Sequence, residues 1–235
     1  LGTDFGIWDD VAAYFGTDYR LLRYDLRGHG LSDAPPAPYS IADHVGDLAA
    51  LLDAREIKGA IIVGLSVGGM VAQGLAARRP ELARMLVLCD TAHKIGSPEM
   101  WNARIEAVRK SGLASIADAV IDRWFGEEFR KRYPEDLVGY RNMLMRTPEE
   151  GYVGTCMALR DADMTATASS LTQQTLCLVG TEDKATPPDL VKSLSALIPN
   201  SIFKTLSDTA HLPCVERPRI YAARLEAFIR RNWSA

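Results

Sequence analysis

The chain has 235 residues, 47% apolar and 24% charged, and its 27 basic and 30 acidic residues leave a formal net charge of −3. This composition excludes an intrinsically disordered chain, because enough apolar side chains are present to build a core. It also argues against nucleic-acid binding, since the arginines are scattered among carboxylates instead of forming the basic surface that a polyanion requires. We therefore expect a folded protein with a small-molecule partner.

Short apolar runs alternate along the chain with segments of helical periodicity. One predicted helix begins at a capping box formed by Ser40 and Asp43 and continues to Leu52, and a last helix carries Tyr221 and Phe228 on its apolar face. Alternation of this kind is typical of βαβ units, and continuous apolar strands predict a mostly parallel sheet with helices on both faces. Ligands are then expected at the carboxyl ends of the strands. The strands are predicted at 19–24, 60–63, 85–89, 176–179 and 202–206.

The most apolar stretch, residues 59–77, approaches the roughly 20 residues that a membrane span needs. Five glycines interrupt it, and it changes from β-branched to alanine-rich along its length. A buried strand, a tight turn and a buried helix explain this pattern better. The opening Leu1-Gly2-Thr3-Asp4 has neither the basic region nor the apolar segment of a signal peptide. We expect a cytoplasmic protein without a membrane span.

Two of the four cysteines, Cys89 and Cys177, lie inside predicted buried strands. No pair of cysteines, and no cysteine with a histidine, has metal-ligand spacing. We therefore expect four buried, reduced thiols, with no disulfide and no metal site.

The regular alternation stops over residues 92–172, which contain several amphipathic stretches and no convincing strand. The stretch from Leu113 to Trp124 forms one apolar face, and the stretch from Trp101 to Val108 forms another. The sequence thus predicts an α/β core made of residues 1–91 and 173–235, with an inserted helical lid at 92–172.

A G-x-S-x-G sequence spans Gly64 to Gly68 and centres on Ser66. It follows the apolar run 60–63 directly and leads into a helical segment, which is the strand, sharp turn and helix that exposes a nucleophilic serine. Glycines are expected around Ser66, because side chains there would collide with the neighbouring strand and helix. We predict that Ser66 is a nucleophile.

A serine hydroxyl needs a base, and the chain has four histidines. His211 follows the last predicted strand in a polar loop, from which it can reach Ser66, and it is our candidate. For His29, in a glycine-rich turn, bracing of the loop is the better interpretation. His44 is expected on a solvated helix face or as a cap, and His93, after a strand end, could line the pocket.

The acid that orients the base is predicted to be Asp183, which follows the strand at 176–179. The chain order Ser, Asp, His is then the one expected for this architecture. Asp90 lies at the end of the preceding strand and is the competing site for the acid. Asp208 is closer in sequence to His211, but a role in shaping the turn explains it better.

These residues resemble the α/β-hydrolase fold family and, within it, the 3-oxoadipate enol-lactonases. The general resemblance rests on the segment from Asp25 to Ser32, on the turn at Ser66, and on Asp183 and His211. More specific likenesses cover nearly the whole chain. They are the opening with Trp8, the stretch from Thr91 to Trp101, Arg123-Trp124-Phe125 and Glu150-Gly151-Tyr152. Such proteins carry about three strands ahead of the opening loop, so the chain is expected to begin within the fold.

The resemblance implies an oxyanion hole formed by the backbone N–H groups of Val67 and Leu1, and a substrate contact at Trp124. It also implies a serine hydrolase without metal or organic cofactor that opens a carboxylated enol-lactone in aromatic catabolism. The substrate carboxylate needs a cationic partner, and the sequence leaves open which lid arginine supplies it. The candidates are Arg104, Arg123, Arg132, Arg141 and Arg160.

Two other functions stay open. A broad carboxylesterase or perhydrolase would use the same triad on simple esters, and a ligand receptor on a hydrolase scaffold would turn substrate over only incidentally. In each case the partner is a small molecule. The sequence does not determine the oligomeric state.

Overall fold

The computed structural model describes residues 1–233. Its four strands form one sheet in the order β1-β2-β3-β4, and every neighbouring pair is parallel. Valines and leucines from adjacent strands lie side by side, as Val63 does with Val87 and Leu88 with Cys177. Four of the predicted strands and the parallel arrangement are thereby confirmed. The strands are β1 (Ala60–Leu65), β2 (Ala83–Cys89), β3 (Gln174–Gly180) and β4 (Ser201–Leu206).

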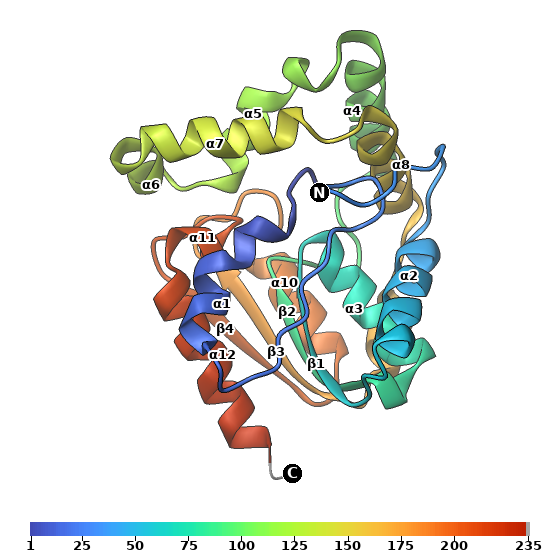
Figure 1. Cartoon of the computed structure of the whole chain (residues 1–235), viewed down its shortest axis with the longest axis vertical. Coiled ribbons are helices and arrows are strands. Elements are labelled where there is room, and N and C mark those ends of the chain that lie inside the picture. The colour runs from blue at the N-terminus through green and yellow to red at the C-terminus, as the bar shows by residue number, and fades with distance from the viewer. Residues whose placement is uncertain (234–235) are drawn as a thin grey trace.

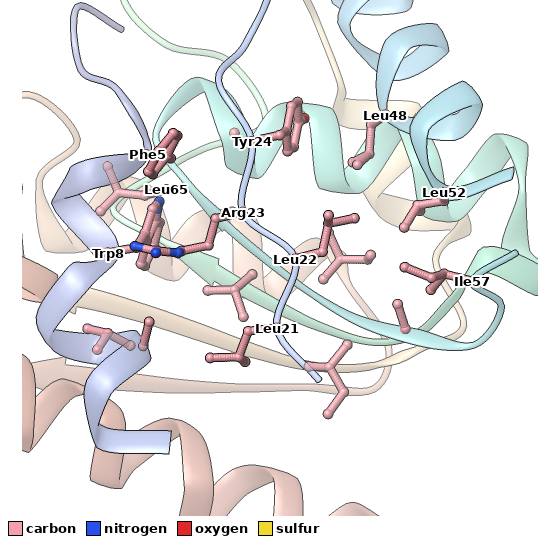
Figure 2. A pocket seen from close by; sticks show the side chains of 18 of the residues that line it. Phe5, Trp8, Leu21, Leu22, Arg23, Tyr24, Leu48, Leu52, Ile57 and Leu65 are labelled. Carbon is pink, nitrogen blue, oxygen red and sulfur yellow. The ribbon is translucent and has the colours of Figure 1, made fainter. Parts of the chain in front are cut away.

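The strand predicted at 19–24 is wrong. This segment runs alongside β1 without pairing with it, and a groove of about 630 Å³ lies between the segment, β1 and α2 (Ile41–Ala54). Figure 2 shows Leu21, Leu22 and Tyr24 along the segment, with Leu52 and Ile57 at the same groove. Because the segment forms no ladder with β1, its favourable composition alone does not make it a strand.

Helices cover both faces of the sheet (Figure 1). On one face, α3 (Val67–Arg78) packs on β1 and β2, α10 (Pro188–Leu197) packs on β3 and β4, and α2 packs on α3. On the other face, α1 (Asp9–Phe15) and α12 (Pro218–Asn232) lie against each other, and α11 (Pro213–Glu216) precedes α12. Strands β2 and β3 are buried almost throughout, as strands covered on both sides should be. Short 3₁₀ helices occur at Phe5–Trp8, Pro80–Leu82 and Leu113–Ser115.

The predicted capping box is present at the start of α2. The Ser40 side chain accepts a hydrogen bond from the Asp43 backbone N–H, and the Asp43 carboxylate accepts one from the Ser40 backbone N–H. His44, on the same helix, is only 1% exposed and packs edge-on against Tyr39. The prediction of a solvated or capping His44 is therefore wrong. Burial lowers the pKa of His44 to about 4.

Residues 92–172 contain six α-helices and no strand. Figure 1 shows α4 to α8 gathered over one end of the sheet. The face predicted from Leu113 to Trp124 is divided, because a short 3₁₀ helix ends before α5 begins at Ala117. The helix α9 contacts α3 and α10 of the core. The six helices are α4 (Pro98–Ser111), α5 (Ala117–Trp124), α6 (Glu127–Arg132), α7 (Pro134–Met145), α8 (Glu149–Asp161) and α9 (Thr165–Ser170).

The predicted division into a core and a lid at 92 and 172 remains a prediction, and the last two residues of the core segment 173–235 lie outside the described residues. All four cysteines are buried and free. Across residues 1–233, no helix is both long enough and apolar enough to span a bilayer.

Candidate active site

Ser66 lies between β1 and α3, with a backbone φ of 56° and ψ of −121°. A positive φ is strained for a residue with a Cβ atom and marks a sharply turned segment. At Gly64 an added Cβ would lie 2.3 Å from the carbonyl oxygen of Gly68, and at Gly69 it would lie 2.5 Å from the Thr91 side chain. Gly68 itself faces open space. The close packing thus requires glycine at positions 64 and 69. At Gly68, the second glycine of the motif, a side chain would meet no neighbouring atoms.

The backbone of Ser66 is tied to the end of β2. Its N–H donates to the carbonyl of Cys89 at 2.9 Å, and the hydroxyl of Thr91 donates to the Ser66 carbonyl at 2.6 Å. Two hydrogen bonds to a neighbouring strand end hold the turn rigid, so the direction of the serine side chain is set by the sheet.

Asp183 and His211 are in direct contact, although 28 residues separate them. The Nδ1 atom of His211 lies 2.9 Å from Oδ2 of Asp183. The carboxylate also accepts hydrogen bonds from the backbone N–H groups of Ala185 and Thr186 and from the Thr186 hydroxyl. Burial alone would raise the pKa of Asp183, but His211 and the Thr186 donors outweigh it and lower the pKa below its usual value. Asp183 is therefore an ionised acceptor that holds the imidazole by Nδ1 and leaves Nε2 available.

The loop that carries His211 is fastened to the end of α5. The backbone N–H groups of His211 and Leu212 both donate to the carbonyl of Trp124 at 3.1 Å. The partly buried carboxyl group of Glu216 accepts from the N–H of Ala210 at 2.7 Å and from that of Gly126 at 3.0 Å. Burial raises the pKa of Glu216 to about 7. This residue, which was not predicted from the sequence, thus joins the histidine loop to the segment after α5.

Asp90, the competing acid, is fully buried beside this pair. Its Oδ1 accepts from the N–H of Gly180 at 3.0 Å, whereas Oδ2 has no hydrogen-bond partner within residues 1–233. Burial and the nearby charge of Asp183 raise the pKa of Asp90 well above its usual value. A neutral acid that makes no hydrogen bond to His211 is a poorer orienting group than Asp183.

Asp90, Asp183 and His211 each offer one atom within 4.8 Å of the others, which is the spacing of a metal site. Nδ1 of His211 is however engaged by Asp183, and the raised pKa keeps Asp90 uncharged. The donor set therefore suits hydrogen bonding better than a cation.

A cavity of about 180 Å³ opens above these residues and is lined by both Ser66 and His211. Leu1 and Trp124 also line it, and Val67 is the first residue of α3, directly after the serine. The remaining walls come from the loop before α4, from the lid helices and from the loop after Asp183. They include three cations, Arg104, Arg123 and Lys184, and no carboxylate.

The other predicted candidates lie elsewhere. His93 does not line this cavity. His29 is 1% exposed, its Nδ1 donates to the Arg27 carbonyl, and burial lowers its pKa to about 3, so it braces its loop. Arg141 and Arg160 pair with Asp118 and Asp161 away from the cavity, and Arg132 lies over the Tyr133 ring.

Thr186 and Lys184 were not predicted from the sequence either. Neither belongs to a motif, although both lie within three residues of Asp183 and share its loop. Thr91 has a comparable position after β2. A search of the residues that follow each strand would have found all three, since a parallel sheet collects its site at the carboxyl ends of its strands.

The chain matches the alpha/beta hydrolase family over residues 2–224. It is 34% identical to 3-oxoadipate enol-lactonase 2 of Acinetobacter baylyi, over 98% of this chain and 86% of that protein. The solved enol-lactonase of Burkholderia xenovorans LB400 superposes with a TM-score of 0.95 at 36% identity, covering 98% of this chain and 88% of the other. A thermophilic esterase of Thermogutta terrifontis, solved with malate bound, superposes with a TM-score of 0.92 at 29% identity. The match covers 97% of this chain and 86% of the esterase. The chain belongs to the alpha/beta hydrolase family.

Proposed function

We propose that this hydrolase opens a carboxylated enol-lactone, converting 3-oxoadipate enol-lactone to 3-oxoadipate through an acyl-enzyme in aromatic catabolism. The observation that carries the proposal is the ionised Asp183 held against Nδ1 of His211, with His211 and Ser66 on one cavity. The choice of lactone is supported by the relatives named as enol-lactonases.

In the proposed first step, Oγ of Ser66 attacks the lactone carbonyl while Nε2 of His211 takes its proton. Asp183 keeps the imidazole in the required orientation and stabilises the imidazolium that forms. The backbone N–H groups of Val67 and Leu1 are proposed to bind the oxyanion. Val67 suits this role because it starts α3, where N–H groups have no partner within the helix.

Collapse of the tetrahedral intermediate breaks the ring C–O bond and leaves the acyl group on Ser66. The leaving group is an enolate, which is far less basic than an alkoxide, so its expulsion needs little help from an acid. The imidazolium of His211 returns its proton to the enolate, and the resulting enol tautomerises to a ketone. A water molecule deprotonated by His211 then attacks the ester and releases 3-oxoadipate, which regenerates the Ser66 hydroxyl.

The cavity suits a substrate that carries a negative charge. Its three cations and its lack of acidic side chains give it a positive potential. The related Thermogutta terrifontis esterase was solved with malate, which is a dicarboxylate. Trp124, 5% exposed and on the cavity wall, is proposed to contact the apolar face of the ring.

The experiment is steady-state hydrolysis of 3-oxoadipate enol-lactone by the wild-type protein, Ser66→Ala and His211→Ala. Each variant should lose at least about 10³-fold in kcat, because triad members act as one unit. Circular dichroism provides the control for folding. If Ser66→Ala turned the lactone over as fast as the wild-type protein, Ser66 would not be the nucleophile.

The esterase relative favours a second candidate, a carboxylesterase or perhydrolase of broad specificity. This enzyme would use the same triad but would hydrolyse a simple aryl ester as efficiently as the carboxylated lactone. Comparing kcat/KM for p-nitrophenyl acetate and the lactone separates the two, since only a lactonase should prefer the lactone strongly. Binding without measurable turnover of either compound would favour a receptor instead.

A further inference from the structure

We propose that Arg104 of the lid helix α4 binds the carboxylate of the substrate and so makes this lid helix the element that selects anionic lactones. The inference rests on the proposed function, because it assigns the anionic end of that substrate to one side chain. It also answers the question that the sequence left open among five lid arginines.

Ion pairs engage four of the lid arginines away from the cavity. Arg109, Arg130, Arg141 and Arg160 each form an ion pair with a carboxylate, and none of them lines the cavity. Within residues 1–233, the three cations that do line it have no carboxylate partner: Arg104, Arg123 and Lys184. Three unpaired positive charges around a nucleophile make a site that an anionic substrate would complete.

Among these three cations, Arg104 alone is partly buried, whereas Arg123 and Lys184 are exposed to solvent. An exposed charge is screened by water and salt, so it attracts an anion only weakly. The charge of Arg104 also acts on Tyr152, a buried cavity residue: burial raises the pKa of Tyr152, and the nearby guanidinium opposes that rise. The guanidinium of Arg104 therefore lies near Tyr152, which also lines the cavity.

The guanidinium is also held in place before any substrate arrives. It lies over the ring of Trp101, one turn earlier on α4, with 5.4 Å between its central carbon and the ring centroid. The ring is fixed in turn, because its Nε1–H donates to the carbonyl of Ile95 at 2.6 Å. A planar guanidinium held over a fixed ring can offer two parallel N–H groups to a carboxylate with little loss of entropy.

The test compares two lactones with the same reacting ring. One is 3-oxoadipate enol-lactone, and the other is α-angelica lactone, a neutral enol-lactone with a methyl group in place of the carboxymethyl group. Arg104→Gln should raise KM for the carboxylated lactone by roughly 10- to 100-fold, the range for a lost charge-assisted pair. It should change kcat less than threefold and leave kcat/KM for the neutral lactone nearly unchanged.

Two variants serve as controls. Arg109→Gln removes the same charge from the same helix but outside the cavity, and it should leave the selectivity of the enzyme unchanged. Arg104→Lys should restore only part of the affinity, because an ammonium group cannot bind a carboxylate with two parallel hydrogen bonds.

A third measurement does not depend on turnover of either lactone. Adipate should inhibit hydrolysis of p-nitrophenyl acetate competitively in the wild-type protein and at least tenfold more weakly in Arg104→Gln. If the wild type turns over neither lactone, the proposed function fails, while the adipate measurement still tests Arg104. If Arg104→Gln loses both lactones equally, or if Arg123→Gln alone abolishes the preference, the assignment to Arg104 is overturned.

Discussion

The backbone of Ser66, the proposed nucleophile, is strained at the turn between β1 and α3. Its φ of 56° falls where a Cβ atom is unfavourable, and the two hydrogen bonds to the end of β2 keep it there. The strain is thus compensated by the neighbouring strand, and the side chain is directed out of the sheet.

This strain predicts a stability difference between two variants that lack the Ser66 hydroxyl. The free energy of unfolding of Ser66→Gly should be about 1 kcal/mol larger than that of Ser66→Ala, because glycine adopts the positive φ without strain. Both variants lack the hydroxyl, so the comparison isolates the backbone. Urea denaturation measures the difference, and equal midpoints would show that the turn is not strained.

The two buried aspartates should respond differently to the same substitution. Asp183→Asn should lower kcat by about 10³- to 10⁴-fold, because an amide can stabilise the wrong tautomer of His211 and cannot stabilise its charged form. Asp90→Asn should lower kcat less than tenfold, since the neutral acid of Asp90 is replaced by a neutral group of the same shape. Lactone kinetics decide the question, and the reverse order would make Asp90 the orienting acid.

At the scale of secondary-structure elements, the histidine loop and the end of α5 behave as one unit. Trp124 accepts hydrogen bonds from His211 and Leu212, and Glu216 accepts from Ala210 and Gly126. The position of His211 therefore depends on α5, the helix that also contributes Trp124 to the cavity wall.

The raised pKa of Glu216 predicts how the stability of this junction depends on pH. Burial raises this pKa from the ordinary glutamate value of 4.5 to about 7, so between these values the folded protein binds more protons than the unfolded chain. The contribution of Glu216 to stability should therefore be complete below about pH 4.5 and decline until about pH 7. The measurement is the free energy of unfolding of wild type minus that of Glu216→Gln across this pH range. A difference that rises with pH would contradict the assignment.

A pair of glycines forms the contact between α8 and the core. An added Cβ at Gly151 would lie 2.0 Å from the carbonyl oxygen of Gly28, whereas at Gly139, on α7, it would meet nothing within 4 Å. Gly151→Ala should therefore lower the free energy of unfolding by about 1 to 3 kcal/mol through overpacking. Gly139→Ala, the matched control, should raise it by about 0.5 to 1 kcal/mol through helix propensity. Thermal unfolding of both variants provides the comparison.

At the scale of the whole molecule, each of the four strands delivers one residue to the same place. Ser66 follows β1, Asp90 follows β2, Asp183 comes after β3, and His211 comes after β4. Parallel strands end at one edge of the sheet, so residues far apart in sequence meet there. The lid helices then form part of a cavity over this edge, which three cations and Ser66 line together.

Ser66 and His211 are proposed to act as one unit, so the losses of transition-state stabilisation caused by the two single substitutions should not add. The double variant Ser66→Ala/His211→Ala should be no more than about threefold slower than Ser66→Ala alone, since either change already removes the covalent route. Single-turnover rates with the lactone measure this. Losses that multiply would mean that His211 assists a reaction that does not pass through Ser66.

Much of this arrangement could be read from local patterns. Apolar runs predicted β1 to β4, the spacing of Ser40 and Asp43 predicted a capping box, and a strand before G-x-S-x-G predicted the turn at Ser66. These features depend on neighbours within a few residues. The segment 19–24 had the composition of a strand but no pairing partner, and His44 was buried by Tyr39 and α8, which no local pattern reports.

The amino-acid sequence by itself determined the fold family, the parallel sheet and the few side chains able to act as nucleophile, base or acid. The tertiary structure decided which aspartate contacts His211, which of the lid arginines face the cavity, and that Glu216 joins the base to the lid. The physical reason is that residue types and short spacings encode local conformation, whereas these contacts depend on where loops and helices come to lie over one edge of the sheet.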